Sequence, residues 1–448
     1  MEFKDALKNQ TLSREDTINI TKKYIEINRY LFAQKTIYNY LKTNKFEEEL
    51  VEILADIYNF NGEYKKAKKL YSTIYKKSKN DDFKHHIIQK IKKTEERIEL
   101  SKNQIKLAVV VNEDEDDFLD PIIKGINYDY WVKKYIIPRN YARFLNFLSR
   151  ALKNKIINKK LYKFILKITH KKLNKALKWA DIIWVEWATD NAIAASLLKP
   201  NSKKLFIRLH RYEAFDFYPL LIEWQRVDNL VIVNNYITNI FNERNVNIDK
   251  RKFILIPNGV DLNRYGYCQH LQGFNIAWIS HITPMKNLHL ALEILRILLE
   301  IDDRYILHVA GNFTDLVYKK YIKQSIKNMN LVKNVIFYDW VNDINEWLED
   351  KNYLLSTSVC EGHPFNVIEA MAKGIKPVIN NFCGAELVFD KNFLFNNIDE
   401  AIKMITRDQY DSQLYRNYII EKQWTEKDQV DKFKRLIEEL NKNINISL

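Results

Sequence analysis

The sequence is poor in cysteine, glycine and proline, with three, nine and eight of these residues among 448. An odd number of cysteines without paired spacing argues against a disulfide framework and against a zinc site. Because glycine and proline are scarce, those that occur are expected to mark special backbone positions such as turns and helix ends.

Long uncharged apolar runs are also missing, and none approaches the length needed to span a bilayer. The first residues include Glu2 and Asp5 and lead into no apolar core, so no signal peptide is expected. The expected location is the cytoplasm, with at most a peripheral contact at the inner face of the membrane. Hydrophobic residues make up 46% of the chain, which excludes global disorder, and the length fits about three domains.

Positive charge is in excess, since 71 Lys and Arg against 57 Asp and Glu give a net charge of +14. This favours anionic partners such as phosphorylated small molecules or anionic lipid, but an ordinary lysine-rich surface explains the bulk charge equally well. Nucleic acid is not an expected partner, because charge alone supports it and no interleaved aromatic and basic strand motif is present.

The most basic segment, residues 148–178, carries Arg150 and ten lysines and no acidic residue. It is expected to be a helix with four apolar residues on one face: Ile157, Leu161, Phe164 and Ile168. We expect this face to pack onto a sheet. The alternative is that the helix lies on anionic lipid.

Residues 1–100 are predicted to be helical throughout, because apolar residues recur at helical spacing. Three pairs recur 34 positions apart: Tyr30 with Tyr64, Ala33 with Ala67, and Ile37 with Tyr71. This is the period of tetratricopeptide repeats, which the stretch 54–75 resembles. The segment is expected to recruit a protein partner or an extended acceptor. An ordinary helical bundle is the alternative.

From Ile105 onward, short apolar runs alternate with amphipathic helices, which is typical of buried parallel sheets. The predicted strands fall into two sets of five: 106–111, 181–187, 205–210, 229–234 and 253–259, then 274–280, 305–311, 334–340, 352–358 and 376–381. The expected fold class is therefore α/β, with two Rossmann-like lobes over 105–265 and 272–424 behind the helical domain. A helix over 425–448 is expected to cross back to the first lobe.

The segment 358–374 combines a strand end with a short helix. Pro364 is predicted at the first helical position and Gly374 where the helix stops. The open amides at the helix start, those of Phe365, Asn366 and Val367, together with the helix dipole predict an anion site.

Two carboxylates accompany this helix, Glu361 just before it and Glu369 inside it. Carboxylates accept hydrogen bonds from neighbouring hydroxyls of a sugar or ribose. Their placement around a helix that starts at a strand end points to a binding site for a phosphorylated sugar compound. Cys360, beside Glu361, has no dedicated base and is interpreted as a packing residue.

The run EGHPFNVIEAMAKGIKPVI (361–379) resembles the signature of retaining GT-B glycosyltransferases of the family-four type. Three further segments resemble that family: WISHITPMKN (278–287), IPNGVD (256–261) and CGAELV (383–388). The resemblance extends from Ile105 to the C-terminus and is strongest over 253–390.

The resemblance implies transfer of a sugar from a nucleoside-diphosphate sugar to a glycan, lipid-linked or protein acceptor, with retention and without a required metal or other cofactor. Lys286 would hold the diphosphate, Glu369 the ribose, and Glu361 the donor sugar and departing phosphate. His210 would face the donor sugar as a second catalytic residue. The donor site would be completed by His281, Gly362, His363, Phe365, Asn366 and Val367.

Two features depart from the family pattern. His281 stands where the family has an arginine, and the acidic run 112–120 replaces the usual Gly-Gly after the first strand. Glu186 and Trp187 follow a strand end and either line the acceptor side or pack internally. The alternative function is a degenerate transferase that acts as a repeat-based binding or scaffold protein, but the joint presence of Lys286, Glu361 and Glu369 favours an enzyme.

Overall fold

The computed structural model describes all residues except 1–11, 27–29, 45, 114, 116–117 and 446–448. Contacts divide the chain into two compact units. Unit 1 comprises Met1–Arg208, Asp216–Leu230 and Lys434–Leu448, and unit 2 comprises Leu209–Phe215 and Val231–Phe433.

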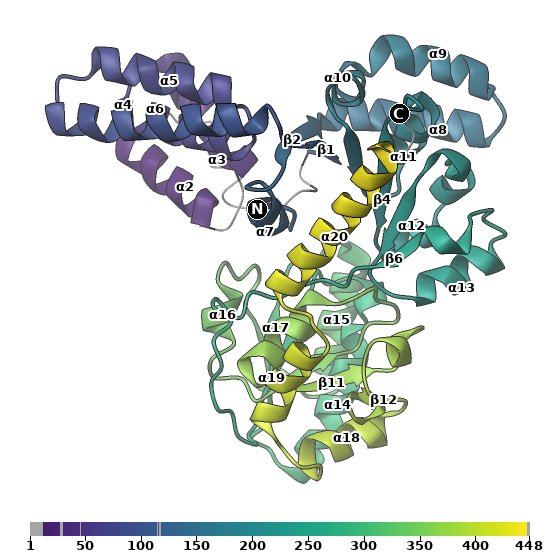
Figure 1. The fold of residues 1–448 in the computed structure, drawn as a ribbon. Helices are drawn as coiled ribbons and strands as arrows, with labels where there is room; N and C mark the ends of the chain where they lie inside the picture. Colours follow the sequence, from purple (N-terminus) through teal and green to yellow (C-terminus); the bar gives the residue numbers. More distant parts are fainter. Residues whose placement is uncertain (1–11, 27–29, 45, 114, 116–117, 446–448) are drawn as a thin grey trace. The chain divides into compact units, whose positions relative to one another are not determined.

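The N-terminal segment is helical over its described residues, as predicted, and residues 1–11 of that prediction lie outside them. Its helices are α2 (Arg14–Glu26), α3 (Tyr30–Thr43), α4 (Glu48–Phe60), α5 (Tyr64–Lys77) and α6 (Asp81–Ser101) (Figure 1). The starts of α2 and α4 are 34 residues apart (14 to 48), as are those of α3 and α5 (30 to 64). This agrees with the predicted period, while membership of the tetratricopeptide class stays a prediction.

The helical segment contacts the first sheet through the turn after α4. Gly62 has a φ of 69°, and a Cβ at this position would lie 2.0 Å from the carbonyl oxygen of Val132. The indole of Trp131 donates a hydrogen bond to the Gly62 carbonyl at 2.9 Å. The backbone approach therefore requires glycine, and it brings the helices against strand β2 (Trp131–Ile137), which lies at one edge of the first sheet.

Two six-stranded sheets follow, with the orders β2-β1-β3-β4-β5-β6 and β12-β11-β10-β7-β8-β9. The first contains β1 (Lys106–Asn112), β2, β3 (Ile182–Glu186), β4 (Lys204–Leu209), β5 (Asn229–Ile232) and β6 (Phe253–Leu255). The second contains β7 (Asn275–Ile279), β8 (Ile306–Ala310), β9 (Val335–Phe337), β10 (Tyr353–Ser356), β11 (Lys376–Asn380) and β12 (Leu394–Phe395). All ten predicted strands are present, and the predicted pair of Rossmann-like lobes behind a helical segment is confirmed.

Two strands were not predicted. In β2 the pair Lys133 and Lys134 interrupts the apolar run, as suits a strand at the sheet edge, and β12 is only two residues long. The prediction missed β2 because two lysines interrupt its apolar run, and it missed β12 because that strand is so short.

Helices cover both faces of the second sheet, as a doubly wound fold requires. One apolar core joins α14 (Leu288–Ile301), α15 (Leu316–Asn328) and α18 (Ile398–Thr406) to the sheet, and another joins α17 (Phe365–Lys373) and α19 (Ser412–Glu421) to it (Figure 1). A short helix, α16 (Ile344–Trp347), lies between β9 and β10 in the sequence. The first sheet is accompanied by α7 (Asp120–Ile126), α8 (Arg139–Lys153), α9 (Lys159–Thr169), α10 (Lys171–Trp179), α11 (Asp190–Leu198), α12 (Arg211–Phe215) and α13 (Tyr236–Glu243).

The predicted packing of the basic segment is wrong. The segment forms parts of three helices, because Lys155 takes a left-handed backbone (φ 59°) after α8 and His170 separates α9 from α10. On α9 the buried residues are Tyr162 and Leu166, and the face predicted to pack is exposed: Leu161 by 45%, Phe164 by 61% and Ile168 by 59%, with Ile157 partly buried. Helix α9 carries apolar residues on two faces, and the face with Tyr162 and Leu166 is the one that is buried.

The C-terminal helix α20 (Glu426–Asn445) belongs to both units. Within unit 2, the side chain of Gln429 donates to the carbonyl of Pro257 at 2.9 Å. Within unit 1, Lys434 forms an ion pair of 2.7 Å with Asp129. Of the helices in the described part of the chain, none combines the length and apolar character that a bilayer crossing requires.

Candidate active site

Helix α17 begins directly after the loop that follows β10. Pro364 is its N-cap, one residue earlier than predicted, and Gly374 ends it in the left-handed conformation with a φ of 90°, as predicted. The amide of Val367 donates to the side-chain oxygen of Asn366 at 2.9 Å, so the expectation that this amide is open is wrong. The Asn366 amide group in turn donates to the carbonyl of Ile279 at 2.8 Å, which ties the helix start to the end of β7.

The ammonium of Lys286 forms an ion pair with the carboxylate of Glu361. Lys286 ends a short helical turn after β7, and its carbonyl accepts a hydrogen bond from the hydroxyl of Thr357 at 3.1 Å. The two side chains are only 23% and 11% exposed, so their interaction is weakly screened by solvent. Two residues that the sequence assigned to one site are therefore in contact.

Glu369 lies inside α17 in an environment that disfavours its charge. Burial raises the pKa of Glu369 to about 7, although a hydrogen bond with Tyr265 and the charge of Arg264 both lower it. The carboxyl is therefore divided between its protonated and ionised forms near neutral pH. Sequence reasoning missed Tyr265, which is a buried residue of the segment joining the two sheets.

Two buried asparagines hold the backbone just before α17. Asn234 donates to the carbonyl of Gly362 at 3.1 Å, and Asn258 donates to that of His363 at 2.7 Å. A Cβ at Gly362 would lie 2.9 Å from a methyl group of Val233, so this close approach requires glycine. Asn234 was not predicted, and its only sequence signal is a polar residue directly after an apolar strand.

The ring of His363 packs edge-on against Trp424, with ring centres 4.4 Å apart. His363 is 4% exposed, so its side chain belongs to an aromatic cluster that also includes Phe389. A binding role for this residue would therefore fall to its backbone.

Arg211 is a cation next to this loop that sequence reasoning missed. It begins α12, directly after His210, whose amide donates to the Glu213 carboxylate at 3.2 Å. The Arg211 Cβ lies 3.5 Å from where a Cβ at Gly362 would stand. Burial raises the pKa of the Cys360 thiol, and a hydrogen bond and charge from Arg211 oppose that shift. A raised thiol pKa agrees with a packing role for Cys360, because a nucleophile needs the thiolate.

His281 provides a hydrogen-bonding ring without a fixed charge. Partial burial lowers the pKa of His281, and the nearby ammonium of Lys286 lowers it further, so the ring is neutral at pH 7. Its ring centre lies 5.7 Å from that of Trp340. The positive charge at this position of the site therefore comes from Lys286.

Glu186 and Trp187 pack inside unit 1. The Glu186 carboxylate accepts a hydrogen bond from the indole of Trp184 at 2.8 Å and lies 3.5 Å from the guanidinium of Arg208, with both charged side chains fully buried. Trp187 donates to the Glu115 carbonyl at 3.2 Å. These contacts favour packing over exposure to an acceptor. Within the acidic run 112–120, residues 114, 116 and 117 lie outside the described ones.

The described side chains include no group of three or more His, Cys, Asp or Glu residues that is arranged to hold a metal ion. The charged groups assembled around the start of α17 are Lys286, Glu361 and Arg211. This arrangement presents two cations near a helix N-terminus, which suits an anionic ligand.

Comparison with protein families matches residues 272–443 to the family described as "Glycosyl transferases group 1". A curated relative from Escherichia coli, "UDP-Gal:alpha-D-GlcNAc-diphosphoundecaprenol alpha-1,3-galactosyltransferase", is 26% identical over 182 residues, which covers 36% of this chain and 46% of that protein. A second from Staphylococcus aureus (strain COL), "Poly(ribitol-phosphate) alpha-N-acetylglucosaminyltransferase", is 29% identical over 162 residues, which covers 36% of this chain and 28% of that protein. The chain thus matches less than half the length of either relative.

Among solved structures, the chain resembles HepE from Anabaena in complex with UDP. The TM-score is 0.58 at 15% sequence identity, over 75% of this chain and 100% of that one. At this identity the likeness concerns the fold, and it agrees with the two-lobed arrangement of parallel sheets.

Proposed function

Since the chain carries a domain of the glycosyl transferases group 1 family, we propose that the protein transfers a sugar from a nucleoside-diphosphate sugar to an acceptor, with retention of configuration. The observation that carries the proposal is the ion pair of Lys286 with Glu361 beside the start of α17. A decayed site has no reason to keep this pair, so a purely scaffolding role is not favoured.

The donor diphosphate binds at Lys286 and the N-terminus of α17. A lysine ammonium has three hydrogen-bond donors, so Lys286 retains capacity for phosphate oxygens while it contacts Glu361. As the sugar–phosphate bond breaks, negative charge develops on the departing diphosphate. A preorganised cation and a helix dipole stabilise that charge without a metal ion.

The remaining donor groups act on the ribose and the sugar. Glu369 accepts hydrogen bonds from the ribose hydroxyls, and its ionised form does so more strongly. Glu361 and His210 contact the donor sugar, and the backbone of Gly362, His363, Phe365 and Asn366 borders it. Arg211, which contacts Cys360, adds positive charge beside the loop that precedes α17.

The acceptor is a glycan, a lipid-linked sugar or a protein. The names of the two curated relatives describe a diphospho-lipid acceptor and a poly(ribitol phosphate), both of which are anionic. A net charge of +14 suits an acceptor of that kind. The helical segment α2–α6 recruits the extended acceptor or a protein partner, and the protein works in the cytoplasm, with peripheral contact at the membrane.

The test is a thermal-shift panel of nucleoside diphosphates and nucleotide sugars on the full chain, because a specific ligand stabilises the state that it binds. The best ligand is then assayed for release of the nucleoside diphosphate. We expect one base to stabilise the protein and the Lys286→Ala variant to lose that shift, while Lys391→Ala, at an exposed lysine of the same unit, retains it. If no nucleotide shifts the unfolding temperature, or if Lys286→Ala binds as well as the parent protein, the donor assignment is wrong.

A further inference from the structure

The outer side of the α8–α9 hairpin exposes large apolar side chains. Phe147 on α8 is 68% exposed, Ile156 in the connecting loop 75%, and Phe164 on α9 61%. Phe144, Leu161 and Ile168 add to the same set at 38%, 45% and 59%. Such residues occur singly on many surfaces, but six on one helical hairpin are unusual for a surface that faces only water.

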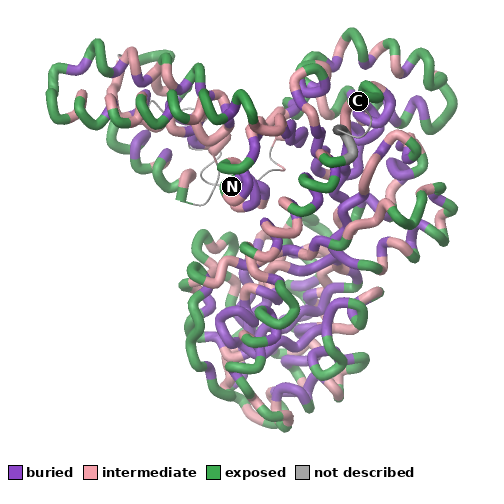
Figure 2. Tube along the Cα trace, viewed as in Figure 1, coloured by how far each residue is buried: buried purple, intermediate pink, exposed green. Residues whose placement is uncertain are grey.

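The inner side of the hairpin explains why these residues face outward. Both helices pack against α11, and their buried residues include Leu148 on α8 and Leu166 on α9. The hydroxyls of Ser149 and Tyr162 share a hydrogen bond of 3.0 Å between the two helices. With this inner side fixed on α11, the side chains on the opposite side of each helix face solvent, and Figure 2 shows exposed residues along both helices.

The segment that forms this hairpin and the following helix α10 carries charge of one sign. Residues 139–179 include thirteen Lys and Arg and no Asp or Glu: Arg139, Arg143, Arg150, Lys153, Lys155, Lys159, Lys160, Lys163, Lys167, Lys171, Lys172, Lys175 and Lys178. Lys159 has an ion-pair partner, Glu223, at 2.5 Å. On α9, Lys160, Lys163 and Lys167 directly precede the exposed Leu161, Phe164 and Ile168, one each, in the sequence. Apolar and cationic groups are thus mixed on one surface.

We propose that the α8–α9 hairpin docks on an anionic lipid bilayer, with Phe147, Ile156 and Phe164 entering the headgroup region and the lysines contacting lipid phosphates. Aromatic and aliphatic side chains favour the interface between headgroups and acyl chains, and lysines near the surface are attracted to anionic lipid. A second copy of the chain is a poor occupant, because two such hairpins, each with several lysines and no acidic residue of its own, would repel one another. The proposal concerns unit 1 and does not depend on the donor site.

The test is flotation of the full-length protein with vesicles of phosphatidylcholine alone or with about one third phosphatidylglycerol, at low and high salt. We expect the protein to float with the anionic vesicles at low salt and to stay behind with neutral ones. The double variant Phe147→Ser, Phe164→Ser is expected to lower the bound fraction at least about tenfold, because both side chains leave the apolar region. A second variant, Lys163→Glu with Lys167→Glu, retains both aromatics and is expected to lose binding as well.

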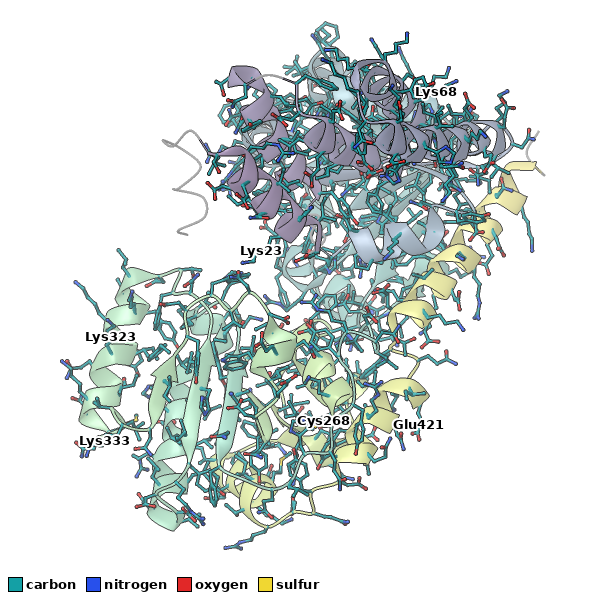
Figure 3. The ribbon with its side chains drawn as sticks, turned by 90° about the vertical axis from the view of Figure 1, so that its left-hand side faces the viewer. Lys23, Lys68, Cys268, Lys323, Lys333 and Glu421 are labelled. Carbon is teal, nitrogen blue, oxygen red and sulfur yellow. The ribbon has the colours of Figure 1, made fainter. Side chains whose placement is uncertain are left out.

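A matched control comes from α15 in unit 2. Leu316 and Val317 are each 78% exposed and border Lys319, Lys320 and Lys323. Figure 3 shows Lys323 with Lys333 at the outer edge of that unit. The double variant Leu316→Ser, Val317→Ser removes as much exposed apolar surface from a comparably basic neighbourhood and is expected to float like the parent protein.

Each contrary result overturns the proposal. Equal flotation of the Phe147 and Phe164 variant would show that the hairpin does not dock. If only the α15 control variant loses flotation, the membrane contact belongs to unit 2. If the parent protein floats equally well with neutral and with anionic vesicles, the lysines have no role in docking. Because all substituted side chains are exposed or partly exposed, we expect unchanged unfolding temperatures, and the charge variant decides the matter if the serine variant unfolds early.

Discussion

The ammonium of Lys286 contacts the carboxylate of Glu361, although 75 positions separate the two residues in the sequence. The loop after β7 and the loop after β10 supply one residue each, and the two strands are neighbours in the second sheet. In parallel sheets the carboxyl ends of adjacent strands meet at one edge, which is where ligands bind in folds of this type. The ion pair therefore marks the edge of unit 2 at which a donor is expected.

Replacement of Lys286 by alanine is expected to reduce transfer by about two orders of magnitude or more, because a preorganised charge that stabilises the leaving diphosphate is lost. The substitution also leaves Glu361 without its cation, which adds repulsion toward the phosphate. The measurement is the steady-state rate of transfer, or of donor hydrolysis, with Lys391→Ala as the control. Turnover close to that of the parent protein would refute the assignment.

Replacement of Glu369 by glutamine is expected to stabilise the ligand-free protein at high pH. The folded-state pKa of Glu369 is raised to about 7 from an ordinary value of 4.5, so the folded state binds the proton more tightly than the unfolded state. Protonated Glu369 therefore contributes fully to the free energy of unfolding below pH 4.5. This contribution is lost as pH rises through 7, and the total loss is about 3 kcal/mol.

Glutamine is neutral throughout that range, so the variant should melt higher than the parent protein near pH 8 and at about the same temperature near pH 4. The same substitution should weaken nucleotide binding, since an amide accepts ribose hydrogen bonds less strongly than a carboxylate. Glu421→Gln, at an exposed position labelled in Figure 3, is the control. A difference in melting temperature that does not vary with pH would mean that Glu369 titrates normally.

Replacement of Asn234 by alanine is expected to destabilise the protein by about 1–3 kcal/mol, because the buried carbonyl of Gly362 loses its hydrogen-bond donor. Asn235 is the matched control, since it is the next residue, is exposed, and makes no side-chain capping bond to α13. Urea unfolding monitored by tryptophan fluorescence gives both free energies. Equal effects of the two substitutions would show that the Asn234 contact contributes nothing.

Activity is expected to survive chelation by EDTA. In the proposed mechanism, Lys286 and the N-terminus of α17 supply positive potential at the diphosphate, so we expect no divalent cation to be needed to neutralise the leaving group. Transfer is measured before and after dialysis against EDTA. Complete loss of activity that Mg²⁺ or Mn²⁺ restores would contradict both the prediction and the proposed mechanism.

Removal of residues 1–100 is expected to leave nucleotide binding unchanged and to reduce transfer to the natural acceptor, because the proposed donor residues all lie in unit 2. The truncation exposes edge strand β2, because Trp131 loses its hydrogen bond to the carbonyl of Gly62. A second truncated variant that also carries Trp131→Lys is therefore made to keep this edge polar and the protein soluble. Thermal shifts with donor confirm that each shortened protein is folded. Transfer to the natural acceptor at the full rate would show that the helices do not recruit it.

Much of the second sheet was predictable because its signals are local. Gly374 ends α17 in a left-handed conformation that glycine adopts without strain, and the apolar runs of the central strands leave little choice of secondary structure. The pairing of Lys286 with Glu361 was predictable only through the order of the strands.

The failures concern contacts that no local pattern encodes. The apolar stripe of Leu161, Phe164 and Ile168 has the spacing of a buried face, yet Tyr162 and Leu166 offer a second one, and only the position of α11 decides between them. Arg211 and Asn234 reach the loop before α17 from segments more than a hundred residues earlier. Their residue types are ordinary after a strand, so the sequence contains no signal for the contact.

The raised pKa of Glu369 has a consequence for the thermodynamics of ligand binding. If ribose hydroxyls bind the ionised carboxylate, each bound nucleotide expels a proton from those molecules in which Glu369 was protonated. The heat measured by calorimetry at neutral pH would then depend on the ionisation enthalpy of the buffer. Titrations in phosphate and in Tris would differ in enthalpy while agreeing in affinity, and the difference would count the protons released at this single side chain.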